Sequence, residues 1–237
     1  MKSWLGNVVG SQLRKPHGAL ANLAGRIMNR SNRSLYDRVI ENLHPAPKAT
    51  VLEIGFGNGS HFPQILRLEP TLRLLGVEVS PEMNRVASKS HHADIASGRV
   101  KLLLDHAELP DGSVDIVLAV NVIYFWPNPE ENLAKIRRLF KPGGRFVIGI
   151  RPYETLVAMP FTKTGFILRP ESEWREQLRS AGFVIEREEE VPAARGELPD
   201  LVWTVVTPLY VALPISSSYW SFSTQKQKEG RNRAVGL

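Results

Sequence analysis

The stretch VLEIGFGNGSHF, residues 51–62, places three glycines at alternate positions directly after an apolar run. The apolar run favours a buried β-strand, and the residues after the glycines favour a helix. A turn between a strand and the next helix leaves backbone N–H groups without partners, and side chains there would hold a ligand away. Gly55, Gly57 and Gly59 therefore indicate a turn whose backbone a ligand can approach.

The spacing of the glycines separates two kinds of nucleotide-binding turn. A dinucleotide-binding turn follows G-x-G-x-x-G and would need a glycine at position 60, where this chain has Ser60. A tight turn that serves only packing is the alternative explanation of the glycines.

Strands and helices are expected in alternation along most of the chain, which predicts an α/β sheet. The expected strands are residues 50–56, 72–80, 99–105, 114–125, 145–150, 183–190 and 201–207. The expected helices between them are residues 64–69, 80–88, 129–140 and 171–183. Ser80 is the expected N-cap of the second helix, and His91 and His92 are expected in an exposed loop.

Three segments differ in composition and predict the domain organisation. Apolar residues at helical spacing before the glycines predict a helical N-terminal extension over 1–46, which we expect to act as a lid. The core is expected over 47–215. Residues 216–237 are rich in serine and basic side chains, and we expect a poorly ordered tail.

The net charge of +6 is unevenly distributed over the 237 residues. Residues 1–50 carry +6, residues 51–208 carry −3 and residues 209–237 carry +3. Basic flanks can attract an acidic or phosphate-bearing partner, but solvated helix faces give the same composition.

Other features of the sequence exclude several classes of protein. The chain has no cysteine, so disulfides and thiolate metal sites are excluded, and no His, Asp or Glu spacing suggests zinc. The N-terminus lacks an apolar signal region, and the most apolar stretch is shorter than the ~20 residues of a membrane span. We therefore expect a soluble, cytoplasmic protein without a metal.

Acidic residues end two of the expected strands. Glu78 ends the second, where nucleotide-binding sheets place a carboxylate that accepts hydrogen bonds from ribose hydroxyls. Asp105 ends the third, close to the expected position of an adenine, although a solvated acid at a strand end is the alternative there.

Through the glycine turn, Glu78 and Asp105, the sequence resembles the class I S-adenosylmethionine-dependent methyltransferases. The resemblance is to the small-molecule, type 11 branch in particular, which includes the ubiquinone and menaquinone methyltransferases. The resemblance covers residues 50–150 through E-x-G-x-G-x-G, GVEVSPEM, DHAELPDGSVDIV and RRLFKPGGRFVI, in the family's order. It implies a Rossmann-like, seven-stranded, mostly parallel sheet with helices on both faces. It also implies S-adenosylmethionine as the cofactor and S-adenosylhomocysteine as its product.

The resemblance further implies a set of cofactor-binding residues. The glycines match the loop under the methionine part, and Glu53 matches an acid often linked to the cofactor's amino group. Glu78 matches the ribose-binding acid, and Met83 matches an apolar contact to the adenine, with a helix-core role as its alternative. The full set is Glu53, Gly55, Phe56, Gly57, Gly59, Glu78, Val79, Met83, Asp105, His106, Ala107 and Asn121.

The acceptor side is expected at the end of the fourth strand, in NVIYFWPNP. Asn121 and Tyr124 are the candidate catalytic residues, as groups that orient the acceptor. Proline does not follow Asn121, which argues against methylases that act on amino groups of bases or of glutamine.

The expected activity is in-line SN2 transfer of a methyl group to a small-molecule acceptor, which the basic flanks would allow to be acidic. Three alternatives stay open: an RNA methyltransferase that uses the basic flanks, a nicotinamide dehydrogenase, and a non-catalytic module with this fold. Nucleic acid is the less favoured acceptor because no RNA-binding module is recognised. Ser60 and the absence of a Tyr-x-x-x-Lys pair disfavour the dehydrogenase. The motifs predict neither the accepting atom nor the oligomeric state.

Overall fold

Seven strands form one sheet in the computed structural model, which describes residues 32–105, 109–163, 165–192 and 199–206. Their order across the sheet is β3-β2-β1-β4-β5-β7-β6. The strands β1 to β5 run parallel, and β7 runs antiparallel to both β5 and β6. The bounds are β1 Thr50–Ile54, β2 Arg73–Val77, β3 Val100–Leu103, β4 Val114–Val120, β5 Phe140–Ile150, β6 Val184–Val191 and β7 Asp200–Val206. The predicted Rossmann-like, mostly parallel sheet is confirmed.

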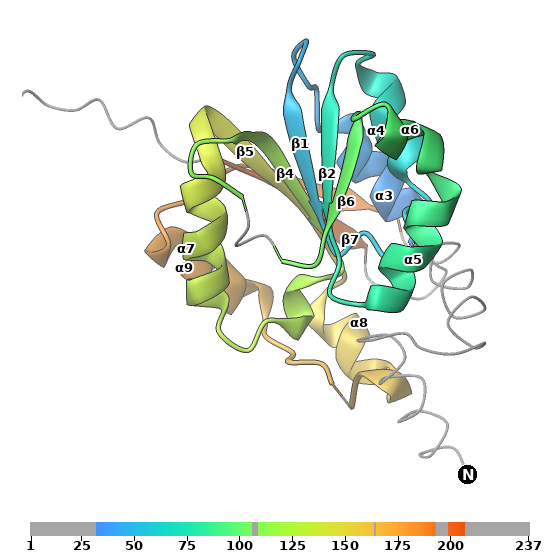
Figure 1. The fold of residues 1–237 in the computed structure, drawn as a ribbon. Helices are drawn as coiled ribbons and strands as arrows, with labels where there is room; N and C mark the ends of the chain where they lie inside the picture. The colour runs from blue at the N-terminus through green and yellow to red at the C-terminus, as the bar shows by residue number, and fades with distance from the viewer. Residues whose placement is uncertain (1–31, 106–108, 164, 193–198, 207–237) are drawn as a thin grey trace, which may run out of the picture.

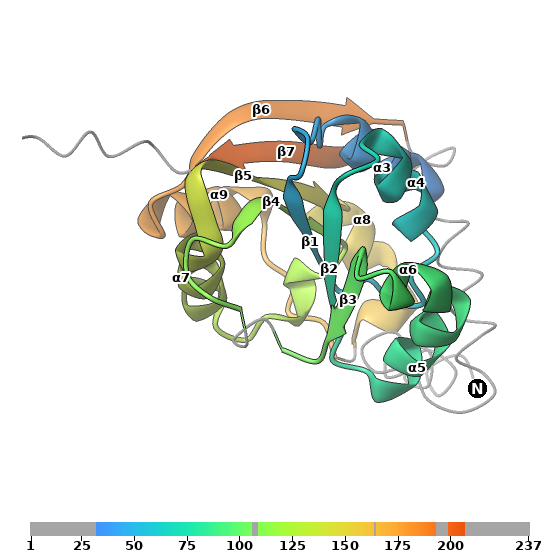
Figure 2. The same ribbon diagram turned by 45° about the horizontal axis from the view of Figure 1, so that its top comes forward.

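Helices cover both faces of this sheet (Figure 1). One face packs against α7 and α9, and the opposite face packs against α3, α4 and α5 (Figure 2). Alternate residues of the strands point to the two sides: Val51 joins one apolar cluster, and Leu52 and Ile54 join the other. The helices are α3 Arg33–Glu41, α4 Phe62–Leu68, α5 Pro81–Ser90, α6 His92–Ala96, α7 Pro129–Leu139, α8 Tyr153–Ala158 and α9 Glu171–Ser180. Short 3₁₀ helices are η2 Ile123–Phe125 and η3 Pro160–Lys163.

Helix α3 lies in the described part of the N-terminal extension, residues 32–46, and is packed into the core. Leu35 and Val39 are fully buried, and both meet β5 at Gly149. A Cβ at Gly149 would lie 2.8 Å from a methyl group of Val39, so the missing side chain lets α3 lie directly on the sheet. The rest of the extension, 1–31, and the tail, 216–237, lie outside the described residues.

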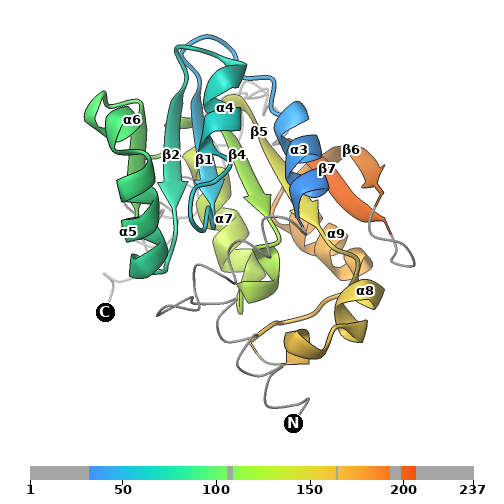
Figure 3. The same ribbon diagram turned by 90° about the vertical axis from the view of Figure 1, so that its right-hand side faces the viewer.

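The fourth strand is shorter than the sequence predicts. We expected it to continue to Phe125, but it ends at Val120. Asn121 has a left-handed backbone with φ of 55°, which a strand cannot contain, and η2 follows. The strand therefore turns sharply at the same edge where the other parallel strands end. Helix α8 lies beyond this edge of the sheet (Figure 3).

Candidate functional site

The glycine turn joins β1 to α4, and all three glycines have a left-handed backbone. The φ angles are 73° at Gly55, 57° at Gly57 and 71° at Gly59. Residues with a side chain rarely adopt this conformation, so glycine is required three times within five residues. A Cβ at Gly55 would lie 2.3 Å from a methyl group of Val122, whereas a Cβ at Gly57 would meet nothing within 4 Å. The turn thus packs on the core at Gly55 and is open at Gly57.

The Glu78 carboxylate is attached to this turn. Glu78 follows β2, is 8% exposed, and accepts from the backbone N–H of Gly57 over 3.0 Å and from that of Ser80 over 2.8 Å. Burial raises the pKa of Glu78 from its ordinary value, and the backbone N–H groups act against that rise. The predicted turn and the predicted ribose acid therefore lie together in the structure.

Glu53 lies inside the molecule near the end of β1. Its side chain is 1% exposed, and neither carboxylate oxygen has a hydrogen-bond partner of acceptable geometry among the described residues. Burial is the main reason that the pKa of Glu53 rises to about 8, and the Tyr36 hydroxyl acts in the opposite direction. A buried carboxylate without a partner is costly, so this position suits a positively charged ligand group.

His91 contacts the glycine turn, a role that the sequence analysis missed. We expected an exposed loop, but His91 is 8% exposed at the junction of α5 and α6. Its Nε2 lies 2.8 Å from the carbonyl oxygen of Gly59. A carbonyl only accepts, so Nε2 carries the proton in this bond. The prediction of an exposed loop was wrong for His91 because adjacent histidines give no periodic signal. His92 is exposed as predicted, but it is the first residue of α6 and does not lie in a loop.

The residues after Glu78 are arranged as the sequence predicts for a helix start. The Ser80 side chain accepts from the backbone N–H of Met83 over 3.3 Å, which confirms the predicted N-cap of α5. Met83 is buried, Val79 is 64% exposed, and Asp105 is exposed just after β3. His106 and Ala107 lie outside the described residues.

At the end of β4, the Tyr124 hydroxyl is engaged with backbone. It accepts from the N–H of Arg151, and it lies 3.1 Å from the Arg151 carbonyl oxygen and 3.2 Å from Oδ1 of Asn121. Burial raises the pKa of the Tyr124 hydroxyl well above its ordinary value. Tyr124 therefore stays protonated at neutral pH and holds the exits of β4 and β5 together.

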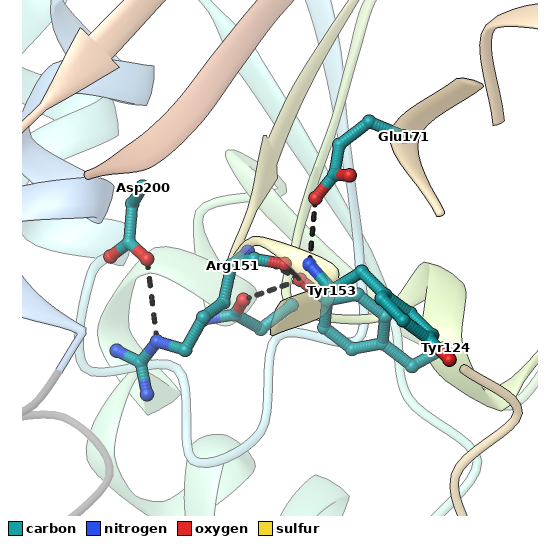
Figure 4. A network of polar contacts seen from close by, with 6 residues as sticks. Tyr124, Arg151, Tyr153, Glu171 and Asp200 are labelled. Carbon is teal, nitrogen blue, oxygen red and sulfur yellow. Dashed lines mark hydrogen bonds and ion pairs between the residues drawn. The ribbon is translucent and has the colours of Figure 1, made fainter. Parts of the chain in front are cut away.

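Polar contacts continue from this point to β7 (Figure 4). The Arg151 Nε lies 3.3 Å from Oδ1 of Asp200, and both side chains are nearly buried. The backbone N–H of Tyr153 donates to Glu171 over 2.6 Å. These contacts join the start of α8 and of α9 to the sheet beside Tyr124.

Three partly exposed phenylalanines form an aromatic group that contacts Tyr124 through Phe166. Phe125 and Phe161 each contact Phe166, with ring centroids 4.7 Å and 6.0 Å apart. Phe166 also stacks near Tyr124 at 6.2 Å. The segment between α8 and α9 thus meets the end of β4 through aromatic rings.

No group of three or more His, Asp or Glu side chains in the described part of the chain is arranged to hold a metal ion. No described helix is long and apolar enough to cross a membrane.

Comparison with known proteins identifies relatives of this chain. A family model described as a methyltransferase domain matches residues 52–148. The uncharacterized methyltransferase YdaC of Bacillus subtilis is 30% identical over 145 residues, which cover 60% of this chain and 78% of YdaC. The thiol S-methyltransferase TMT1A of Homo sapiens is 28% identical over 123 residues, which cover 50% of this chain and 49% of the human protein.

A solved structure is similar in fold over most of the chain. It is a chain in the complex between the Haloferax volcanii Trm112 methyltransferase activator and a putative methyltransferase. The TM-score is 0.70 at 19% identity, and the match covers 84% of this chain and 97% of that one. The match shows that the two chains share a fold.

Proposed function

Because the chain belongs to the class I S-adenosylmethionine-dependent methyltransferases, we propose that it transfers a methyl group from S-adenosylmethionine to a small-molecule acceptor. One observation carries the proposal: the backbone N–H of Gly57 in the glycine turn donates a hydrogen bond to Glu78, the proposed ribose acid. The acceptor class and the roles of individual residues are parts of this proposal.

The residues at the turn fit the cofactor in charge and in space. S-adenosylmethionine carries an ammonium group, and Glu53 offers two buried carboxylate oxygens that lack partners of acceptable geometry among the described residues. A Cβ at Gly57 would meet nothing within 4 Å, which leaves room for a ligand at the backbone. In this proposal Glu53 receives the ammonium group, the three glycines bound the methionine part, and Glu78 receives the ribose hydroxyls.

The remaining proposed contacts surround the adenine and the methyl donor. Met83 packs on the adenine, Val79 lies at its border, and Asp105 with the backbone of His106 and Ala107 meets the adenine amino group. The Phe56 ring is buried against Phe62, so Phe56 is proposed to meet the cofactor through its backbone. Asn121 is proposed to lie under the methyl donor. The Val79 side chain is apolar and 64% exposed directly after Glu78, the proposed ribose acid. This exposure supports a contact between Val79 and the ligand.

For methyl transfer, the main task of the protein is to align the acceptor with the methyl group of the cofactor. A methyl group on a sulfonium is already activated, so the cofactor supplies the leaving group. Holding an acceptor in line with the methyl group can lower the barrier by ~7–11 kcal/mol. Tyr124 does not serve as an ionised base in this account, because its hydroxyl is protonated and engaged with Asn121 and Arg151. Its proposed role is to orient the acceptor side by fixing Asn121.

The acceptor site is proposed beside the aromatic rings of Phe125, Phe161 and Phe166, which the end of β4 and the α8–α9 segment bring together. Partly exposed aromatic rings favour an acceptor with an apolar part. Thiols belong in any acceptor screen, because the human relative is a thiol S-methyltransferase.

The test is methyl transfer from S-adenosylmethionine labelled in the methyl group, with thiophenol, a low-mass metabolite extract and total RNA as separate acceptors. We expect label in thiophenol or in low-mass products, and much less label with Glu78→Ala when the concentration of S-adenosylmethionine is limiting. Label in RNA, with an affinity that falls steeply as salt rises, would support the RNA methyltransferase instead. Cofactor binding without transfer to any acceptor would support the non-catalytic module.

A further inference from the structure

The buried His91 ring fixes one carbonyl group of the glycine turn. Its Nε2 donates to the carbonyl oxygen of Gly59 over 2.8 Å. The same oxygen accepts from the backbone N–H of Phe62, the first residue of α4, over 3.1 Å. A carbonyl oxygen has two lone pairs, so protein donors occupy both of them. The orientation of this peptide group is therefore set by two bonds, and the one from His91 comes from a different helix.

The contact with His91 is possible because Gly59 has no side chain. A Cβ at Gly59 would lie 3.2 Å from the methyl group of Ala87 and 3.2 Å from atoms of the His91 ring. Ala87 is fully buried near the end of α5. The His91 ring also lies against Phe62, with ring centroids 5.0 Å apart. The end of α5 therefore packs directly on the turn, with His91 as the hydrogen-bond donor between them.

Helix α5 is joined to the glycine turn at both of its ends. At its start, Glu78 accepts from the backbone N–H of Ser80, the N-cap of α5, and from that of Gly57. At its other end, His91 donates to Gly59, which is two positions after Gly57. The two bonds hold the turn from two sides. Because a binding site depends on how closely its groups are held in place, loss of the His91 bond would let the turn shift.

We propose that His91 is a positioning residue of the cofactor site: by donating to Gly59, it holds the glycine turn in the conformation that receives the methionine part of S-adenosylmethionine. The inference rests on the proposed function, which assigns that part of the cofactor to the three glycines. His91 acts through the backbone and not by touching the cofactor, because its ring is buried and its Nε2 proton is used on Gly59.

This position predicts which part of a ligand depends on His91. S-adenosylhomocysteine has an adenosine part and an amino-acid part, whereas 5′-methylthioadenosine keeps the adenosine and the sulfur and lacks the amino acid. Since the turn is proposed to meet the amino-acid part, loss of the His91 bond should weaken binding of S-adenosylhomocysteine much more than binding of 5′-methylthioadenosine. A general loss of packing would affect both ligands to the same extent.

The experiment is calorimetric titration of both ligands into the wild type and into variants of the two adjacent histidines. His91→Leu removes the donor, and we expect about tenfold weaker binding of S-adenosylhomocysteine, the effect of one hydrogen bond, with little change for 5′-methylthioadenosine. His91→Gln places an amide N–H donor close to the position of Nε2 and should recover most of the affinity. His92→Leu changes the exposed neighbour and should bind both ligands as the wild type does.

A further variant separates the proposed role from a loss of folding stability. Ile136→Val shortens a fully buried side chain of α7, on the opposite face of the sheet, and should lower stability about as much as the loss of one hydrogen bond. It should leave the dissociation constants of both ligands unchanged. Thermal unfolding shows that each variant is folded at the temperature of the titration.

Wild-type affinity for S-adenosylhomocysteine in His91→Leu, or an equal loss of affinity for both ligands, would overturn the role of His91 alone. If His91→Leu does not fold, His91→Asn takes its place, because the shorter amide lies near the position of Nδ1 and does not reach Gly59. Equal affinities in His91→Asn and His91→Gln would then overturn the role. Absence of S-adenosylhomocysteine binding in the wild type would overturn the proposed function, and this inference with it.

Discussion

The backbone N–H of Gly57 donates to the Glu78 carboxylate over 3.0 Å, which joins the turn after β1 to the end of β2. Gly57 also has a left-handed backbone and open space where a side chain would lie. The Glu78 carboxylate is thus held by backbone N–H groups, and the Gly57 backbone next to it is not covered by a side chain. This arrangement can bind ribose hydroxyls at the carboxylate and the neighbouring part of the ligand at the turn.

Substitution of Glu78 should weaken cofactor binding. Glu78→Ala removes the proposed acceptor of the ribose hydroxyls and a partner of the Gly57 N–H, and we expect at least about tenfold weaker binding of S-adenosylhomocysteine. Calorimetric titration measures the dissociation constant. The control is Glu82→Ala, which removes an acid that is bound only to Arg85 in the described structure. Equal affinities in both variants would contradict the role of Glu78.

A methyl group at Gly57 should affect binding more than stability. Gly57→Ala and Gly98→Ala are matched, because both backbones are left-handed and neither Cβ would meet an atom within 4 Å. Each should lower the free energy of unfolding by about 1–2 kcal/mol. Only Gly57→Ala should also weaken binding of S-adenosylhomocysteine, by about tenfold or more. Wild-type affinity in Gly57→Ala would mean that the cofactor does not lie at this backbone.

Substitution of Gly55 should lower folding stability more than substitution of Gly57 or Gly98 does, because no space is left for a side chain at Gly55. A Cβ there would lie 2.3 Å from a methyl group of Val122, so Gly55→Ala adds overpacking to backbone strain. Urea unfolding should show a loss about 1–3 kcal/mol larger than that of Gly98→Ala. Adding Val122→Ala should recover part of the loss. Equal losses in the two single variants would show that Val122 moves aside without cost.

The sheet could be predicted from the sequence because its signals are local. The glycine turn, the apolar runs and the Ser80 cap are each contained in a few consecutive residues, and the structure confirms them. The end of β4 could not be predicted in the same way. Residues 121–125 continue the apolar run of the strand, and only the left-handed backbone at Asn121 shows where the strand ends.

The contacts of Tyr36 and His91 were missed for a different reason. Each depends on residues distant in sequence: Tyr36 stacks on His61 across 25 positions, and His91 meets Gly59 across 32. Helical spacing marks Tyr36 as buried but does not show what it touches. The position of the glycine turn beside Glu78 was therefore predictable, and the packing of α3 and of the α5–α6 junction against the turn region was not.

The buried acid should make folding stability depend on pH. The pKa of Glu53 is about 8 in the folded protein and close to its ordinary value when unfolded, so the folded protein binds more protons between these values. The stability of the free protein is therefore full below about pH 4.5 and falls as pH rises toward 8. Glu53→Gln keeps the shape without the charge and should be more stable than the wild type at pH 8, by about 1–4 kcal/mol.

Urea unfolding at pH 5 and pH 8 measures this difference, which should nearly vanish at the lower pH. Glu186→Gln on β6 removes an exposed acid and serves as the control. A Glu53→Gln variant that is less stable than the wild type at pH 8 would show that the carboxylate is ionised and satisfied in the folded protein.

The most direct test of the central claim is calorimetric titration of S-adenosylhomocysteine, and separately of NAD, into the wild type. We expect S-adenosylhomocysteine to bind at one site and NAD not to bind, since Ser60 occupies the third glycine position of a dinucleotide turn. Binding of NAD, or absence of S-adenosylhomocysteine binding, would contradict a methyl-donor site at the glycine turn.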